Sequence, residues 1–132
     1  MRHPKLQQWD DTMKKMFDEI DNHLEDEWGD HFPLHPNRAG RGKTSNKEQD
    51  GLFNVGTFFS AGYGSELGRG YVIDIHMVTL SRIPDEVREE IEEEVVSLVR
   101  ELLPKYFPDR DLKISRDGNV YKIHGDFSLG NL

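Results

Sequence analysis

The sequence has no cysteine among its 132 residues. Disulfides, thiolate catalysis and cysteine-ligated zinc are therefore excluded, and the composition is typical of a reducing compartment. No run of residues approaches the ~18 apolar residues that a membrane helix requires. The first residues, Met1 to Lys5, do not lead into the apolar stretch of a signal peptide. We therefore expect a cytoplasmic location and no membrane association.

Positive charge is also scarce, because 17 Lys and Arg face 25 Asp and Glu, which gives a net charge of −8. This balance repels nucleic-acid backbones and argues against a DNA or RNA partner. Apolar residues make up only 35% of the chain, yet two Trp, four Tyr and seven Phe indicate a folded protein. The length is close to that of one domain, so we expect a single domain over residues 1–132.

Two segments have the apolar periodicity of helices. Over about residues 6–28, apolar side chains recur at spacings of three and four, and Gly29 is a stop signal. A second helix is expected to open at Pro84-Asp85-Glu86, where proline and acidic residues suit a first turn. Pro104 and Pro108 are expected to bracket its end. Each apolar stripe is interpreted as a face that packs on the core.

Four segments alternate in the manner of strands. Residues 52–61 and 71–80 are joined by the glycine-rich segment 62–70, which suggests an antiparallel hairpin. Residues 112–115 and 120–124 flank Asp117-Gly118, a strong hairpin signal. The resulting α-β-β-α-β-β order predicts an α+β fold with a four-stranded, mainly antiparallel sheet and two helices packed on one face.

The alternation also assigns side chains to the two faces of the sheet. The face under the helices is expected to carry Phe53, Val55, Phe59, Tyr71, Ile73, Ile75, Met77, Leu112, Ile114, Tyr121 and Ile123. The open face is expected to carry Asn54, Phe58, Ser60, Asp74, His76, Val78, Lys113, Ser115, Lys122 and His124. A sheet covered on one side, with Phe58 and Val78 on its open side, has reason to pair. We therefore predict a homo-oligomer.

The segment 29–51 is a long glycine- and proline-rich basic loop, and loops of this length are mostly functional or disordered. Its cationic side chains contrast with the acidic chain. One interpretation is an internal clasp on acidic residues such as Glu89 and Glu93. The other is a site for a small anionic ligand, favoured because arginine forks match carboxylate and phosphate. The loop residues proposed to bind the anion are Arg38, Arg41 and Lys43.

Neither glycine-rich segment has a nucleotide-binding motif. Gly40-Arg41-Gly42-Lys43-Thr44 lacks the first glycine of a P-loop, whose place is taken by Asn37, and it lacks the strand and helix context. Segment 62–70 joins two strands, where a dinucleotide fingerprint joins a strand to a helix. Its glycines favour a structural role. Backbone N–H groups at Gly64, together with Arg69, are the alternative anion site.

Asp74 and His76 share one strand face, and His124 is predicted to lie on the same face. Such a set suits a divalent metal or acid–base chemistry, provided that the three side chains converge. A polar, solvated sheet face is the competing interpretation. His31 and His35 flank Pro33, which breaks helical metal-ligand spacing. We therefore expect no bound metal and no cofactor.

The element order is similar to the core of pterin carbinolamine dehydratases, but the His-His-Pro signature of that family is absent, and only His3-Pro4 and His35-Pro36 occur. Size and acidity are similar to those of small secretion chaperones, which are acidic dimers. The sequence favours a small acidic non-enzymatic binding or regulatory module that self-associates. The alternative is a small-molecule enzyme or anion-binding protein that uses segments 29–51 and 62–70 with Asp74, His76 and His124.

Overall fold

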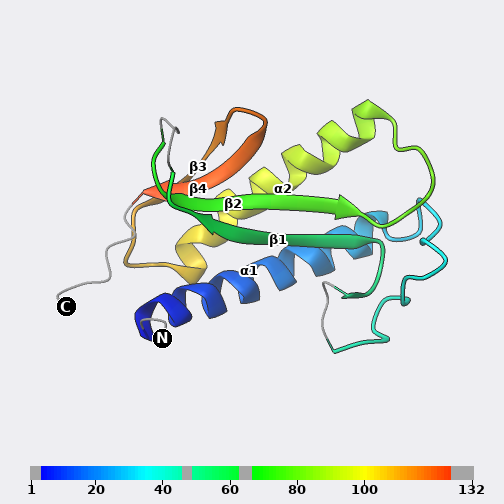
Figure 1. Cartoon of the computed structure of the whole chain (residues 1–132), viewed down its shortest axis with the longest axis horizontal. Coiled ribbons are helices and arrows are strands. Elements are labelled where there is room, and N and C mark those ends of the chain that lie inside the picture. The colour runs from blue at the N-terminus through cyan, green and yellow to red at the C-terminus, as the bar shows by residue number, and fades with distance from the viewer. Residues whose placement is uncertain (1–3, 46–48, 63–66, 126–132) are drawn as a thin grey trace.

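The computed structural model describes residues 4–45, 49–62 and 67–125 and confirms the predicted α+β fold (Figure 1). The elements in chain order are α1 (Pro4–Trp28), β1 (Phe53–Ser60), β2 (Gly70–Met77), α2 (Asp85–Tyr106), β3 (Leu112–Asp117) and β4 (Val120–Gly125). Both helices cover the same face of the sheet (Figure 1). Within the described residues, neither helix is long and apolar enough to cross a membrane.

The four strands form one sheet in the order β1-β2-β4-β3, and each neighbouring pair is antiparallel. β1 and β2 pair along their full length, whereas β2 and β4 pair only from Gly70 opposite His124 to Val72 opposite Lys122. The two hairpins therefore join near the start of β2 and separate beyond it. β1 and β3 are the two edges of the sheet.

The core lies between the helices and the covered face of the sheet. The apolar spacing in each helix places one stripe inward, and the strand alternation does the same for every second residue. The side chains of α1, α2 and the sheet that are buried most completely are Met13, Met16, Ile20, Leu24, Phe53, Val55, Ile91, Val95, Val99 and Ile123. This core holds the two layers together and fixes the positions of both sheet edges.

Two sequence-based expectations about individual residues are wrong. Phe59 was assigned to the core but is 45% exposed, because it lies near the end of an edge strand, where its ring meets Tyr71 edge-on. Lys122 was assigned to an open polar face but is 2% exposed. Its Nζ pairs with Asp117 Oδ2 at 2.8 Å and donates to the Gly68 carbonyl at 2.9 Å, which satisfies the buried charge.

Pro104 and Pro108 are expected to bracket the end of the second helix, and α2 does end between them, at Tyr106, with Pro104 inside its last turn. Proline removes one backbone donor, so the helix there depends on its remaining hydrogen bonds. The Phe107 N–H donates to the Leu103 carbonyl at 2.8 Å and closes the last turn beyond the proline.

The described parts of the segment between α1 and β1, residues 29–45 and 49–52, are largely irregular but pack against the folded domain. Phe32 and Leu34 are partly buried against the core. The His35 N–H donates to the Val78 carbonyl at 2.9 Å, just past the end of β2. The segment therefore lies beside the end of the β1–β2 hairpin, where it can reach the start of β1.

Candidate functional site

The two arginine side chains of segment 29–51 have partners within the protein. Arg38 Nε donates to the Gly51 carbonyl at 3.0 Å, and its Nη2 donates to the carbonyls of Asp50 and Phe53 at 2.9 and 3.2 Å. Arg41 Nη1 pairs with Asp26 Oδ1 of α1 at 2.8 Å. The loop therefore folds back on α1 and on the start of β1.

These contacts involve two of the residues predicted to bind an anion. Arg38 and Arg41 already have internal oxygen partners, whereas Lys43 and Arg69 are exposed. Gly64 lies outside the described residues. The anion role of the set Arg38, Arg41, Lys43, Gly64 and Arg69 stays a prediction.

Glu25, near the end of α1, bonds to the same edge of β1 as Arg38 does. Its side chain is buried, and Oε1 accepts the Phe53 N–H at 2.8 Å. Burial raises the pKa of Glu25, and the hydrogen bond from Phe53 opposes that change. A Cβ atom at Gly51, whose φ is +74°, would overlap the Glu25 carboxylate, so this position requires glycine. Glu25 and Arg38 together hold the backbone that leads into β1.

The structure does not bring the histidines of the sheet together. His124 lies opposite Gly70, and Asp74 is four residues further along β2, which is ~13 Å at the usual rise of a strand. His76 is further still. His124 Nε2 instead lies 2.8 Å from Ser115 Oγ, and His76 Nε2 lies 3.7 Å from Asp74 Oδ1. Asp74 and His76 are thus separated from His124, and the predicted three-residue centre does not form.

The edge of β1 exposes hydrogen-bonding backbone groups. The Val78 N–H donates to the Leu52 carbonyl at 2.7 Å, which places residue 52 in a hydrogen-bonded pair with β2. Because such pairs alternate, the even-numbered residues of β1 bond to β2 and the odd-numbered residues direct their N–H and C=O groups outward. Odd residues of β1 are therefore the ones available to a further strand.

Among the residues that the structure describes, only Phe53, the first odd-numbered residue of β1, has partners for its outward groups. The Phe53 N–H donates to Glu25, and its C=O accepts from Arg38. Among the described residues, no hydrogen bond reaches the outward groups of Val55, Thr57 or Phe59. The edge is thus closed at its start and open along the rest of its length.

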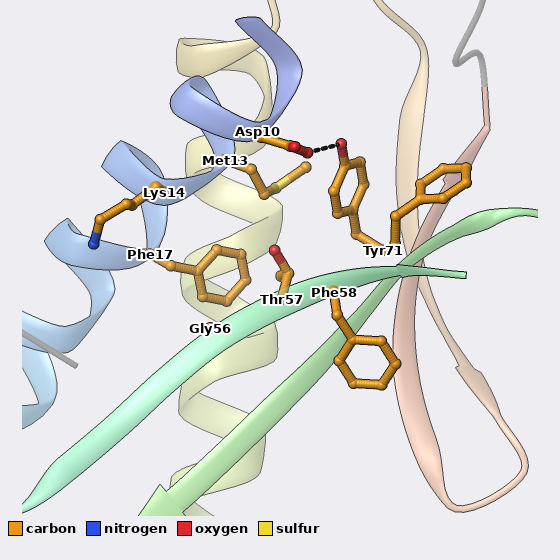
Figure 2. A pocket seen from close by; sticks show the side chains of 9 residues that line it. Asp10, Met13, Lys14, Phe17, Gly56, Thr57, Phe58 and Tyr71 are labelled. Carbon is orange, nitrogen blue, oxygen red and sulfur yellow. Dashed lines mark hydrogen bonds between the residues drawn. The ribbon is translucent and has the colours of Figure 1, made fainter. Parts of the chain in front are cut away.

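A groove of about 260 Å³ runs beside this open edge, between α1 and β1. It is lined by Asp10, Met13, Lys14, Phe17, Gly56, Thr57, Phe58, Phe59 and Tyr71. Tyr71 Oη donates to Asp10 Oδ1 at 2.8 Å across it (Figure 2). Figure 2 shows the Phe58 ring on the opposite side of β1 from Thr57 and Tyr71. Apolar surface therefore borders the open backbone on both sides of the strand.

A second cavity, of about 470 Å³, lies between the end of α2 and the other edge strand, β3. Three cationic residues, Arg100, Arg110 and Lys113, line it together with Asp111 and several apolar side chains. The Arg110 guanidinium lies 5.4 Å from the centre of the Trp9 ring. This cavity combines positive charge with an apolar wall in a protein of net charge −8.

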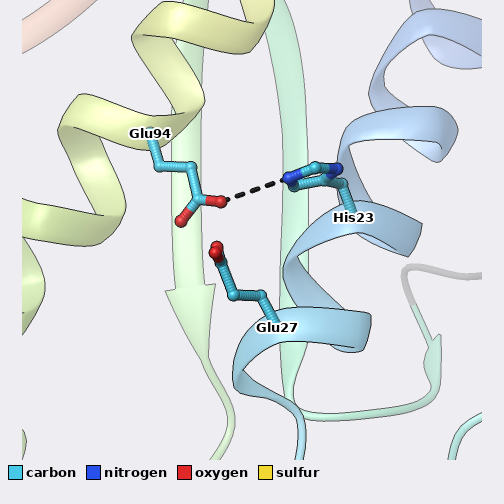
Figure 3. Close-up of side chains that lie close together, drawn as sticks. All are labelled: His23, Glu27 and Glu94. Carbon is cyan, nitrogen blue, oxygen red and sulfur yellow. Dashed lines mark ion pairs between the residues drawn. The ribbon is translucent and has the colours of Figure 1, made fainter.

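A third group joins the two helices (Figure 3). His23 and Glu27 lie four residues apart on α1, and Glu94 reaches them from α2, so that one donor atom of each lies within 4.8 Å of the others. His23 Nε2 is 3.3 Å from Glu94 Oε1, and Trp28 Nε1 donates to Glu94 Oε2 at 3.0 Å. Burial raises the pKa of Glu94, and Glu27 raises it further, while Trp28 opposes both.

Sequence reasoning missed this group. The signal for half of it was present, because a histidine and a glutamate four residues apart on a predicted helix share one face. Glu94 is one of five glutamates in positions 89–94, and periodicity alone does not say which of them faces α1. The helix packing supplies that information.

Comparison with known proteins gives the chain a family. A family model described as "Uncharacterised protein" matches residues 4–125. An uncharacterized protein of Borreliella burgdorferi strain B31 is 42% identical over 127 residues, which cover 96% of this chain and 99% of that protein. No solved structure matches the chain. The chain therefore belongs to this family, whose description names no function.

Proposed function

We propose that this member of the family is a small non-enzymatic binding module that works as a homodimer joined at the edge of β1. The observation that carries the proposal is the composition of that edge. β1 reads Phe-Asn-Val-Gly-Thr-Phe-Phe-Ser, without a charged residue or a proline, in a chain that is 32% charged. Natural edge strands are normally protected from pairing by lysine, proline, bulges or a covering segment. The open part of β1 contains neither lysine nor proline.

The open edge is complementary to itself. Antiparallel pairing of two copies about Thr57 places Val55 of one copy opposite Phe59 of the other and Thr57 opposite Thr57. This is the symmetric register that uses the outward groups of all three residues. Aromatic with β-branched pairs and Thr–Thr pairs are among the favourable cross-strand combinations. A two-fold interface of this kind would join the two sheets into one.

The side chains on the open face of the sheet fit the same register. Phe58 is 57% exposed. In the pairing centred on Thr57 it lies opposite Gly56 of the second copy, which has no side chain to oppose the ring. An aromatic side chain over a strand glycine is a recognised way to stabilise a sheet. Dimerisation therefore removes the largest exposed apolar group of β1 from water.

The test is the mass of the protein in solution by light scattering. The chain mass is 15.3 kDa, and we expect twice that value for the wild type. Phe58→Lys, at an exposed position, places a charge at the proposed interface and is expected to give the single-chain mass. Leu80→Lys is the matched control, because Leu80 is 74% exposed and lies outside β1, and it should remain a dimer.

A second variant separates pairing at the edge from pairing through the open face of the sheet. Thr57→Pro removes an outward N–H and leaves the β1–β2 hydrogen bonds intact, since proline is tolerated on the free side of an edge strand. Edge pairing predicts that this variant is monomeric. A monomeric wild type at high concentration, or dimers that survive both β1 substitutions, would contradict the proposal.

A second candidate function is supported by the cavity beside β3, which suits an anionic small molecule with an apolar body. Arg100 and Lys113 supply charge there, so the wild-type melting temperature should rise with phosphate, sulfate or short-chain carboxylates. The double variant Arg100→Gln/Lys113→Gln should lose that rise, and the exposed pair Arg82→Gln/Arg88→Gln should keep it. A wild type that is indifferent to all three anions would remove this candidate.

A further inference from the structure

We infer that His23, Glu27 and Glu94 form a binding site for a divalent transition-metal ion that links α1 to α2. The proposal is independent of dimerisation at β1. It also replaces the expectation of no metal drawn from the sequence, which rested on other histidines. One imidazole nitrogen and two carboxylates are a ligand set that zinc and similar first-row ions accept, with water in the remaining positions.

The distances fit such an ion. At metal–ligand distances of about 2.0–2.1 Å, two ligand atoms of a tetrahedral site lie ~3.4 Å apart. His23 Nε2 and Glu94 Oε1 are 3.3 Å apart. The donor atom of Glu27 belongs to the same group, within 4.8 Å of the other two. Glu27 is an exposed side chain on a helix surface, so its carboxylate is not held in place by packing and can turn toward an ion.

Trp28 holds Glu94 in the orientation that the site needs. Its indole N–H donates to Oε2 at 3.0 Å, which leaves Oε1 directed at His23 (Figure 3). Partners that fix a ligating carboxylate in this way are a regular feature of metal sites. Trp28 itself is partly buried against the core, so the orientation is anchored in the fold. One of the three ligands is therefore positioned before any ion binds.

The electrostatics of the group also favour a cation. Glu27 and Glu94 place two carboxylates beside each other, and the raised pKa of Glu94 reflects partial burial and that proximity. A divalent ion between them would offset the repulsion and the loss of hydration together. The ligands come from two helices, so the arrangement exists only in the folded chain. Binding should therefore stabilise the fold.

The experiment uses chelator-treated full-length protein and zinc as the probe. Titration calorimetry on the wild type should show one high-affinity zinc ion per chain, with a saturable rise in melting temperature. Magnesium, which prefers all-oxygen sites, should bind more weakly. Glu27→Gln keeps the His23–Glu94 and Trp28–Glu94 contacts and should weaken zinc binding at least ~10-fold, since even outer partners of metal sites contribute that much.

Two further variants make the result decisive. Glu93→Gln changes the same charge at an exposed position of α2 and should bind zinc as the wild type does. His23→Asn should reproduce the loss seen in Glu27→Gln. No zinc binding by the wild type would overturn the proposal. It would also be overturned by unchanged affinity in Glu27→Gln and His23→Asn, because the zinc would then bind to other histidines.

Discussion

The start of β1 and the remainder of β1 share one backbone edge, but among the described residues only the start has its outward N–H and C=O groups hydrogen-bonded. At Phe53, both outward groups are bonded, one to Glu25 of α1 and one to Arg38 of the preceding segment. From Val55 to Phe59, no other described part of the chain covers the edge. The protein thus has a segment able to bond to this edge, and the described part of that segment bonds to Phe53 alone. We interpret the open length as a surface for another strand.

The opposite edge of the sheet supports this interpretation. β3 carries Lys113, Arg116 and Asp117 within six residues, and charges of this kind prevent edge-to-edge pairing. The two edges of one sheet therefore differ in the protection that they carry. An unprotected edge on one side only is compatible with a closed two-fold dimer, whereas two unprotected edges would permit open-ended growth.

The largest expected effect tests whether segment 29–51 closes the start of β1. Arg38→Met removes three hydrogen bonds from a charged donor to backbone carbonyls. Hydrogen bonds of this type contribute ~1.5–3 kcal/mol each, and partial exposure reduces the sum, so we expect a loss of about 3 kcal/mol in the free energy of unfolding. Urea unfolding curves measure it.

The matched control for this prediction is Lys43→Met, which changes an exposed cation of the same segment. It should shift the free energy of unfolding by less than ~0.5 kcal/mol, as exposed substitutions usually do. Equal losses in the free energy of unfolding for Arg38→Met and Lys43→Met would mean that the contacts of Arg38 do not hold the start of β1. The contrast between the two parts of β1 would then lose its structural basis.

The fold was predictable from the sequence because each element has its own periodicity. Spacings of three and four define both helices, and alternation with Asp117-Gly118 defines the second hairpin. The strand order was not predictable. It depends on three residue pairs between β2 and β4, and no local pattern encodes such a contact. For the same reason, the sequence does not reveal the separation of His124 from Asp74 and His76.

The candidate sites were predictable only in part. Phe58 was expected on the open face and is exposed there. The outward direction of the N–H and C=O groups of Val55 and Thr57 was not predictable, because it depends on which residues of β1 are hydrogen-bonded to β2. Arg38 illustrates another limit. Its partners are backbone carbonyls, and reasoning from charge looks for carboxylates or anions. Sequence patterns therefore located the unusual segment but not its contacts.

The smallest expected effect tests the other contact that closes β1, through the titration of Glu25. Its folded-state pKa is raised above 4.5, mainly by burial, so the fold favours the neutral carboxyl. The stability from this group is fully present below pH 4.5, its unfolded value, and is lost as pH rises through the folded pKa. Glu25→Gln keeps an oxygen that accepts the Phe53 N–H but cannot ionise. The free energy of unfolding of Glu25→Gln should therefore not show this decrease as pH rises.

The measurement is the difference in free energy of unfolding between wild type and Glu25→Gln, from urea curves at several pH values from 4 upward. We expect the difference to move in favour of the variant as pH rises. Groups with lowered pKa values, such as Glu19 beside Tyr106 and Lys105, contribute in the opposite direction in both proteins and cancel. A difference that moves in favour of the wild type would mean that the ionised carboxylate is the form that the fold prefers. In that case Glu25 would hold Phe53 as a charged acceptor, and the start of β1 would be closed by two charged side chains instead of one.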